Sequence, residues 1–369
     1  HLIFIVKIKN KMKVCILGNS LSSLTLANAL VNQNIHVELI SQKKNHKIAK
    51  SRTLGISKSN IDYFKENIID IDKFLWKINK IEIYTENLKN EKLLAFKDDN
   101  KQIFSILRNH ELYKVLEQNL SKNRFFKKKC LSDKNSSLDK NFEIIINCDF
   151  FHSFTKKYFS KKIVKKYNSI SYTTNIRHKK ILNNTATQIF TKRGPLAFLP
   201  ISNTETSIVY SLNDFSEKKN NVSELVIKYN FKYEITKINK IDIFELSSLN
   251  LRSYYYDNIL AFGDLLHKIH PLAGQGFNMT IRDIKVLVNI IKNKLDLGLA
   301  LDSSVNEEFE KKLKHKNFIF SNGINFIHEF FNIERKINNN FLSKSVQLLG
   351  KNSSVNNLFT KIADEGIFF

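Results

Sequence analysis

The first apolar and polar positions of the chain predict a strand, a helix and a second strand. Val14–Leu17 is a short apolar run that ends at Gly18. Ser20–Asn32 then carries leucine and valine at helical spacing, and His36–Ile40 returns to a strand-like run. This order predicts a βαβ unit whose first tight turn lies at Gly18.

The pattern between residues 50 and 149 continues this mixed α/β character. Lys50–Ile78 mixes a loop with a helix, and the segments after it predict two stretches of strand, a helix and a third strand that ends at Asp149. These segments are Ile81–Asp98, Gln102–Leu107, Glu111–Leu120 and Glu143–Cys148.

From Ser169 to Leu212 the pattern becomes alternating and rich in β-branched residues, which predicts antiparallel strands of a separate sheet. Asn258–Phe262 is one more apolar strand and leads directly into Gly263. Phe277–Leu297 has helical spacing without a breaker, and Glu307–Phe369 predicts amphipathic helices.

These elements together predict an α/β fold: a Rossmann-like nucleotide-binding domain, an inserted β-rich domain and a helical C-terminal region. The expected boundaries are 12–165 and 251–300 for the two parts of the nucleotide-binding domain, 166–250 for the insertion and 301–369 for the helical region.

Charge adds a preference for anionic surfaces. The 59 Lys and Arg against 35 Asp and Glu give a formal net charge of +24. Lysine is abundant along the whole chain, and the runs Lys127–Lys129, Lys156–Lys157 and Lys161–Lys166 are typical of solvated surface. No RNA-binding motif or zinc-ligand spacing is present, so we favour compositional drift over a nucleic-acid site. A weak attraction to a membrane surface stays open.

The cysteines favour a reducing, cytoplasmic compartment. Cys15, Cys130 and Cys148 form no CxxC pair, and their number is odd. No apolar stretch reaches the ~20 residues that a membrane-spanning helix needs. A peripheral position at the inner face of the membrane is therefore the only membrane contact that this pattern favours.

Glycine and proline are scarce but clustered. All three prolines and four of the ten glycines lie in the segments 194–200 and 263–276. The second segment predicts a strand end, a tight loop and the start of a long helix, which directs free backbone N–H groups and a helix dipole at one point. An anionic or electron-rich ligand suits that point, although an ordinary strand–loop–helix connection has the same pattern.

The residues of this segment resemble the second FAD motif of the ubiquinone-biosynthesis hydroxylases. Gly263-Asp264, the run from His267 to Asn278, and Arg282-Asp283 carry the resemblance. These hydroxylases are class A flavin monooxygenases related to para-hydroxybenzoate hydroxylase. The resemblance implies FAD as cofactor and places Asp264 at its ribityl chain. It also implies a cradle for the isoalloxazine ring, made by Gly274, Gln275, Gly276 and Asn278. Gly263 and Pro271 are expected to bind the cofactor as well.

Further matches follow in the family's order, from about residue 13 to 350. Gly18 keeps the first glycine of GxGxxG, whereas Ser20 and Ser23 replace the other two. Ser41 stands where the family has an acidic residue for the adenosine ribose. The resemblance implies that Gly18, Ser20 and Ser41 bind FAD on its adenine side.

Three other stretches resemble the family's remaining motifs. Arg52 begins a stretch like R-x-x-A-L-S, and Asn109 matches a polar position that touches FAD in relatives. Asp149 begins a stretch like DG-x-x-S-x-x-R, in which Phe150 replaces the glycine and Lys156 the arginine. Gly194–Pro200 resembles a strand that lies over the flavin on the substrate side.

Two histidines precede the flavin loop. His267 and His270 have the i, i+3 spacing of a metal pair, but no third ligand is placed to complete a metal site. His270 is a weak candidate for a catalytic base. The favoured interpretation is that both side chains orient the loop through hydrogen bonds.

The resemblance implies an FAD-dependent monooxygenase that uses NAD(P)H and O2 to hydroxylate a polyprenylated phenol on the ubiquinone pathway. Such a lipid substrate would give the basic surface a use in peripheral membrane contact. A ubiquinone-biosynthesis complex is an expected partner. Two alternatives stay open: a hydroxylase of a soluble aromatic acid, and a non-catalytic subunit of a hydroxylase assembly with weakened FAD binding.

Overall fold

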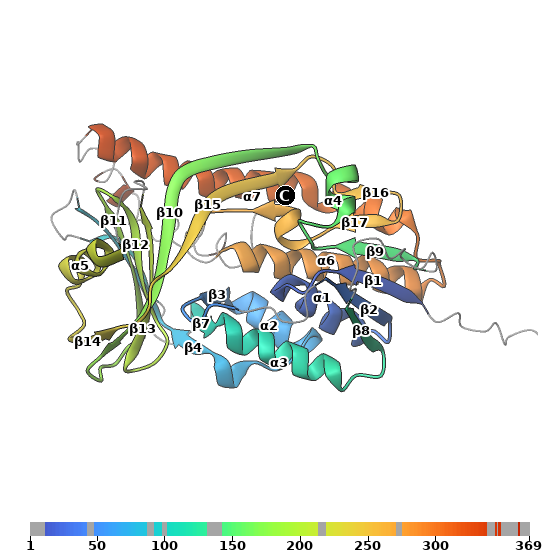
Figure 1. Cartoon of the computed structure of the whole chain (residues 1–369), viewed down its shortest axis with the longest axis horizontal. Coiled ribbons are helices and arrows are strands. Elements are labelled where there is room, and N and C mark those ends of the chain that lie inside the picture. Colours follow the sequence, from blue (N-terminus) through green and yellow to red (C-terminus); the bar gives the residue numbers. More distant parts are fainter. Residues whose placement is uncertain are drawn as a thin grey trace, which may run out of the picture.

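A six-stranded sheet forms one end of the molecule (Figure 1). The computed structural model describes residues 12–42, 48–86, 92–97, 102–130, 142–212, 219–270, 275–337, 344, 346–347 and 361. In spatial order the strands are β16 (Tyr255–Tyr256), β17 (Ile259–Ala261), β9 (Ile144–Asn147), β1 (Lys13–Leu17), β2 (His36–Ser41) and β8 (Phe126–Cys130). All pairs except β16–β17 are parallel. Buried parallel strands have continuous apolar sequences, so β1, β9 and β17 were predictable.

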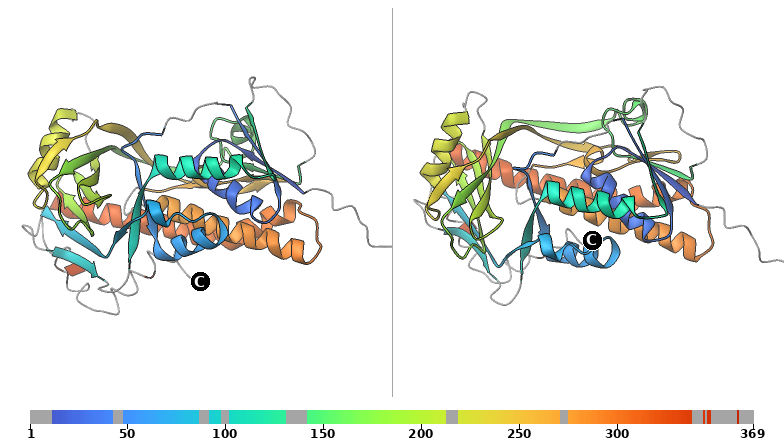
Figure 2. Two further views of the ribbon diagram at one scale, coloured as in Figure 1. Left: turned by 90° about the horizontal axis from the view of Figure 1, so that it is seen from below. Right: turned by 60° about the horizontal axis from the view of Figure 1, so that its bottom comes forward.

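Helices cover this sheet and link it to the rest of the chain. α1 (Leu21–Val31) contacts α3 (Asn109–Ser121) and α6 (Gln275–Asp296), and α6 also contacts α2 (Lys58–Asn67) and α7 (Ser303–Ile337). Figure 2 shows α1 beside α3, with α6 and α7 running along the length of the molecule. The predicted βαβ unit and the predicted helices near residues 111–120 and 277–297 are confirmed.

A second, nine-stranded sheet forms the other end. Its main path is β18 (His267–Lys268), β15 (Asp242–Leu251), β10 (Lys162–His178), β13 (Glu205–Leu212), β12 (Gly194–Pro200), β11 (Thr185–Thr191), β5 (Lys80–Thr85) and β6 (Lys92–Lys97), and β14 (Ile235–Ile238) pairs with β10. α5 (Lys219–Tyr229) packs on it through Val222, Leu225 and Val226. The predicted α/β class with a β-rich second sheet is confirmed. The exact domain boundaries stay a prediction, since β5 and β6 from 12–165 join this sheet.

A small third sheet lies between the two large ones. It orders β3 (Thr53–Ser57), β7 (Phe104–Arg108) and β4 (Trp76–Ile78), with a 3-10 turn, η1 (Asp72–Phe74), before β4. The sequence pattern predicted a loop and a helix across residues 50–78, and missed β3. Gly55 interrupts the apolar pattern of this strand. The structure leaves room only for glycine there, because the Phe104 ring lies over this position: a Cβ on Gly55 would lie 2.1 Å from Cε2 of that ring.

The basic runs and the C-terminal region differ in detail from the expectation. Lys127 and Lys128 are exposed, as predicted for solvated surface, but they belong to the edge strand β8. Lys162 and Lys166 are likewise exposed on β10. α7 is one helix of 35 residues rather than several short ones, and most of the chain after Ile337 lies outside the described residues. No helix in the described ranges combines the length and hydropathy needed to cross a membrane.

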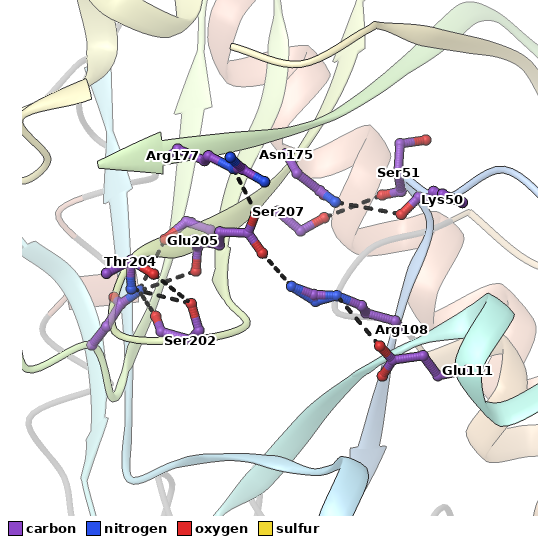
Figure 3. A network of polar contacts seen from close by, with 12 residues as sticks. Lys50, Ser51, Arg108, Glu111, Asn175, Arg177, Ser202, Thr204, Glu205 and Ser207 are labelled. Carbon is purple, nitrogen blue, oxygen red and sulfur yellow. Dashed lines mark hydrogen bonds and ion pairs between the residues drawn. The ribbon is translucent and has the colours of Figure 1, made fainter. Parts of the chain in front are cut away.

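Glu205 joins the small sheet to the large one (Figure 3). Its carboxylate accepts a hydrogen bond from the Arg108 guanidinium at the end of β7, and from Nε of Arg177 on β10 at 3.2 Å. Arg108 Nε also lies 3.9 Å from Glu111 Oε1 on α3. Burial alone would raise the pKa of Glu205, but the two arginines hold it below its usual range. A carboxylate with a lowered pKa stabilises the fold at neutral pH.

We expect Glu205→Gln to lower the free energy of unfolding by about 1–2 kcal/mol at pH 7, because two charge-assisted hydrogen bonds weaken. The loss should shrink as the pH falls below about 4.3, where the unfolded carboxylate takes up a proton and the wild type loses the same stabilisation. Urea unfolding at pH 7 and at pH 4 measures it. Glu234→Gln is the control, because the Lys179–Glu234 pair is exposed. An equal loss in both variants would contradict the role of Glu205.

Candidate cofactor-binding site

The carboxyl ends of four parallel strands meet at one edge of the six-stranded sheet. β1 ends just before Gly18, β2 ends at Ser41, and β9 and β17 end two residues before Asp149 and Gly263. The chain passes from β1 to β2 on one side, and later returns to β9 on the other side of β1. Such a reversal of strand order opens a crevice at the carboxyl edge, where α/β folds bind their ligands.

Gly18 and Asp149 lie against each other at this edge. Gly18 has a φ of +104°, and its N–H donates to the Ile40 carbonyl at 2.8 Å. A Cβ on Gly18 would lie 3.4 Å from the Asp149 Cβ. The structure thus brings together the first glycine of one predicted motif and the aspartate of another, and a side chain at Gly18 would be strained.

The serines that replace the family's glycines have a structural role of their own. Ser20 is the N-cap of α1: its Oγ accepts from Ser23 N at 3.2 Å, and Ser23 Oγ accepts from Ser20 N at 3.3 Å. This capping box satisfies N–H groups that a helix start otherwise leaves free. The remaining first-turn N–H groups and the positive end of the helix dipole stay directed at the strand edge. Cofactor contact by Ser20 and by Ser41, which is buried at the end of β2, stays a prediction.

Phe150 is accommodated at the position of the family's glycine. The turn there is made by side-chain oxygens: Asn147 Oδ1 accepts from Asp149 N at 3.0 Å, and Asp149 Oδ1 accepts from Phe151 N at 2.8 Å. Phe150 has no positive φ, and its side chain packs against the main core. Asx turns of this kind replace the conformational freedom of glycine, so Phe150 does not distort the end of β9.

The Gly263-Asp264 turn contacts the first turn of α1. It forms a 3-10 turn, η3 (Gly263–Leu265), in which Gly263 has a φ of +65°. A Cβ on Gly263 would lie 2.8 Å from the Ser22 Cβ, so only glycine fits there. Asp264 is exposed between two buried neighbours.

The Cys148 thiol lies between the end of β9 and Asp149. Burial is the largest cause that raises its pKa, and the charges of Asp264 and Asp149 add to it, while a hydrogen bond with Ser23 opposes them; the pKa is about 12. The thiol is therefore neutral at physiological pH.

The start of α3 brings two more predicted residues to this region. Asn109 N donates to the Arg52 carbonyl at 3.1 Å, and the Tyr113 hydroxyl donates to the Asn19 carbonyl at 3.4 Å. The Arg52 guanidinium lies 4.5 Å from the ring centroid of Phe244 on β15. Arg52 directly precedes β3 and therefore stands where the small sheet and the nine-stranded sheet meet.

Several buried polar atoms around this edge have no hydrogen-bond partner among the described residues: Asn19 Oδ1, Asn109 Oδ1, His110 Nδ1 and Gln275 Oε1. Buried polar atoms are normally satisfied by protein, water or ligand. Asn19 follows Gly18, Asn109 and His110 begin α3, and Gln275 begins α6. A polar ligand that spans these starts would satisfy them, so the residues present fit a dinucleotide such as FAD.

The flavin-loop residues divide into three groups. Pro271 and Gly274 lie outside the described residues. Gly276 lies in the first turn of α6, and among the described residues a Cβ there would meet only Ile269 Cγ1 at 3.9 Å, so their packing does not require glycine. Asn278 Oδ1 accepts from Ser57 N at 3.0 Å, and its Nδ2 donates to the Gly55 carbonyl at 3.0 Å. Asn278 thus ties α6 to β3, and its contact with a cofactor stays a prediction.

His267 and His270 lie just before the predicted flavin loop. His267 Nε2 pairs with the Asp283 carboxylate on α6, which also accepts from Asn317 Nδ2 on α7 at 3.0 Å. All three side chains are buried. His270 is 1% exposed and packs edge-on against Tyr167, with ring centroids 4.9 Å apart. The hydrogen bond of His267 is in line with the prediction that it orients this segment, whereas the same role for His270 stays a prediction.

The sequence pattern did not indicate Asn19 and Phe244. Asn19 occupies a variable position between two motif residues, and only its neighbours pointed to it. Phe244 lies on β15, which was not predicted, although its alternation of polar and apolar residues is a strand signal.

The sequence profile described as "FAD binding domain" matches residues 91–296, more than half of the chain. The chain belongs to this FAD-binding family. The prediction of FAD as the cofactor is confirmed at the level of the family.

Curated relatives of this FAD-binding protein match over limited segments. The 3-demethoxyubiquinol 3-hydroxylase of Escherichia coli K12 is 30% identical over 152 residues, which cover 39% of this chain and 39% of that protein. The mitochondrial ubiquinone biosynthesis monooxygenase COQ6 of Schizosaccharomyces pombe is 23% identical over 125 residues, which cover 34% of this chain and 26% of that protein. The predicted resemblance to ubiquinone-biosynthesis hydroxylases is thereby confirmed, over well under half the length of these relatives.

Solved structures confirm the fold. The p-nitrophenol 4-monooxygenase PnpA of Pseudomonas putida superposes with a TM-score of 0.76 at 12% identity, over 96% of this chain and 99% of that one. An HpxO variant of Klebsiella pneumoniae in complex with FAD gives a TM-score of 0.75 at 11% identity, over 95% and 99%. The Rossmann-like fold with a second β-rich sheet is shared with these proteins.

The environment of Gly276 gives a test of the flavin cradle. We expect Gly276→Ala to leave the thermal midpoint unchanged or slightly raised, because alanine favours a helix by about 1 kcal/mol. FAD affinity should fall at least about tenfold if the backbone of Gly276 lies against the ring, since the added methyl group would occupy that contact. Fluorescence titration with FAD measures it.

Gly323→Ala is the matched control, because Gly323 lies inside α7 and a Cβ there meets nothing within 4 Å. FAD affinity that stays the same in both variants would show that Gly276 does not approach the cofactor.

Proposed function

We propose that the protein binds FAD at the carboxyl edge of the six-stranded sheet and acts as an aromatic-ring monooxygenase. Its substrate would be a polyprenylated phenol of ubiquinone biosynthesis, with NAD(P)H as reductant and O2 as the second substrate. The names of the E. coli and S. pombe relatives support this reaction class. The partner-free buried atoms Asn19 Oδ1, Asn109 Oδ1 and Gln275 Oε1, gathered at the helix starts, carry the proposal.

Bound FAD would supply the redox chemistry that activates O2. The chain's own residues bind and orient it. The start of α1, with Gly18 and the Ser20 cap, offers N–H groups and a positive dipole to the diphosphate. Asp264 is the exposed acceptor for hydroxyl groups of the ribityl chain. Asn109 and Arg52 would hold the opposite side of the crevice.

The start of α6 would act on the flavin ring itself. Its free N–H groups and dipole favour negative charge, and charge develops on the ring system during reduction. Asn278 fixes this helix start against β3, and the His267–Asp283–Asn317 junction fixes it against β18 and α7. No proton-transfer role is assigned to His270, which is buried against Tyr167.

A second candidate is a non-catalytic subunit of a hydroxylase assembly that has lost productive FAD binding. Ser23 favours it, because this serine stands at the third glycine position and already makes hydrogen bonds with Ser20 in the capping box and with Cys148. Phe150, which replaces a glycine of the family, does not favour it, since the turn at Asp149 is intact.

The visible spectrum of the purified protein tests flavin binding. We expect a flavin absorption band in the wild type and its loss in Asp264→Ala, with the fold retained because Asp264 is exposed. Asp70→Ala is the control, because Asp70 is exposed and distant in the sequence from every predicted FAD motif. A wild type without a flavin band and without micromolar FAD affinity would leave the non-catalytic subunit as the better account.

Lipid extracts of a strain that lacks the gene test the substrate. We expect a polyprenylated phenol that lacks one ring hydroxyl to accumulate, and its mass to identify the step. Restoration by the wild type but not by Asp264→Ala would tie the step to the flavin site. A normal quinone profile in the deletion strain would favour a soluble aromatic acid as substrate.

A further inference from the structure

A surface rich in lysine and exposed apolar side chains surrounds α4 (Ser153–Tyr158), at the end of the molecule opposite α5 and β14 (Figure 1). We call it the α4 surface. It comprises the exposed residues Phe151, Lys156, Lys157, Lys161, Lys162, Ile163, Val164, Lys166, Arg252 and Tyr256.

The apolar members of the α4 surface are unusually open to solvent. Phe151 is 85% exposed, the largest value among the exposed large hydrophobic side chains of the described residues. Tyr256 is 54% exposed and stacks on Tyr158 of α4, with ring centroids 4.1 Å apart. Ile163 and Val164 are 43% and 46% exposed. Large side chains this open to solvent, within one short stretch of chain and the hairpin beside it, are typical of an interaction site.

Lysines alternate with these apolar groups. Residues 150–166 hold six lysines and no Asp or Glu. Lys165 pairs with Glu329 on α7 at 2.8 Å, whereas the other five have no carboxylate partner among the residues that the structure describes. The surface therefore carries an uncompensated positive charge.

The local topology keeps the α4 surface open and continuous. Lys162–Lys166 of β10 pair with β15 on one side only, while Ile170–Arg177 also pair with β13. Arg252 N donates to the Lys161 carbonyl at 3.0 Å, which places the β16 hairpin beside the start of β10. Lysines on an open strand edge protect against aggregation, but that role does not explain an exposed Phe151 outside the strand.

We propose that the α4 surface docks the protein on a bilayer that contains anionic phospholipid. The aromatic rings of Phe151 and Tyr256 suit the head-group layer, and the surrounding lysines suit lipid phosphates. A polyanion such as nucleic acid would satisfy the lysines but leave Phe151, Ile163 and Val164 in water. An anionic bilayer takes up both kinds of group.

Sedimentation with vesicles of phosphatidylcholine alone, and with 30% phosphatidylglycerol (roughly physiological anionic content), tests the proposal without FAD or substrate. Failure of the docking proposal therefore leaves the proposed function untouched. We expect binding only to the anionic vesicles, weakened by salt. Phe151→Ser should weaken it roughly tenfold, and replacement of four lysines by glutamine at least about a hundredfold. These four lysines are Lys156, Lys157, Lys161 and Lys162.

The matched control removes four exposed lysines elsewhere and should keep most of the binding. They are Lys58, Lys180, Lys237 and Lys240. Equal losses in the two quadruple variants would show that general charge alone attracts the protein, and would overturn the proposal. Binding that is insensitive to Phe151→Ser would do so as well, since a polyanion-type contact would then suffice.

Fluorescence supplies a second measurement. Trp76 is the only tryptophan of the chain and lies on β4, outside the α4 surface. Phe151→Trp should therefore add an emission that shifts to the blue with anionic vesicles, while wild-type emission stays unchanged. Absence of a shift in Phe151→Trp would show that this position does not enter the head-group layer.

Discussion

The approach of Gly263 to the first turn of α1 is the contact on which the candidate site depends. A Cβ at Gly263 would lie 2.8 Å from the Ser22 Cβ, so the end of β17 can reach α1 only through glycine. With β17 next to β9, and β9 next to β1, the ends of all three strands are then fixed around the Cys148 thiol. Gly18 and Asp149 come into contact as part of the same arrangement. Three motifs far apart in the sequence thereby become one site.

The nine-stranded sheet is held against this site by polar contacts and by a small apolar cluster, in which Ile78 and Ile106 of the small sheet pack with Ala186 and Ile201. Ser51 Oγ donates to Asp242 Oδ2 at 2.5 Å, Arg52 stacks on Phe244, and Glu205 joins Arg108 to Arg177. The main hydrophobic clusters of the two ends contain different residues. Side-chain hydrogen bonds depend on direction, so they can fix the orientation of the second sheet over the crevice more tightly than apolar packing would. Arg52 belongs both to the candidate site, as a motif residue, and to the contact with the nine-stranded sheet, through Phe244.

The sequence predicted best where one physical cause dominates. Buried parallel strands need continuous apolar runs, so β1, β9 and β17 were found, and a long amphipathic period predicted α6. β3 was missed because Gly55, which the Phe104 ring covers, interrupts its apolar run, and β15 was missed although its alternation of polar and apolar residues is a strand signal. In the site, Gly18, Asp149, Gly263 and Asp264 were predictable from their motif. The role of Asn278 was not, because its partners, Ser57 and Asn60, lie more than 200 positions away.

The drifted motif residues show which features of the FAD motifs the fold itself requires. This glycine-poor chain keeps glycine where any side chain would overlap severely with neighbouring atoms, as at Gly263 and Gly194. A Cβ at Gly194 would lie 1.8 Å from the Ser211 carbonyl oxygen. Where glycine serves only to shape a turn or a helix start, other residues supply the same hydrogen bonds, as Ser20 and Ser23 do in the capping box and Asn147 and Asp149 do before Phe150. Gly276 belongs to neither group, because the described residues around it leave room for a side chain. A glycine that these residues do not require, at the start of the predicted flavin helix, suits the close approach of a ligand.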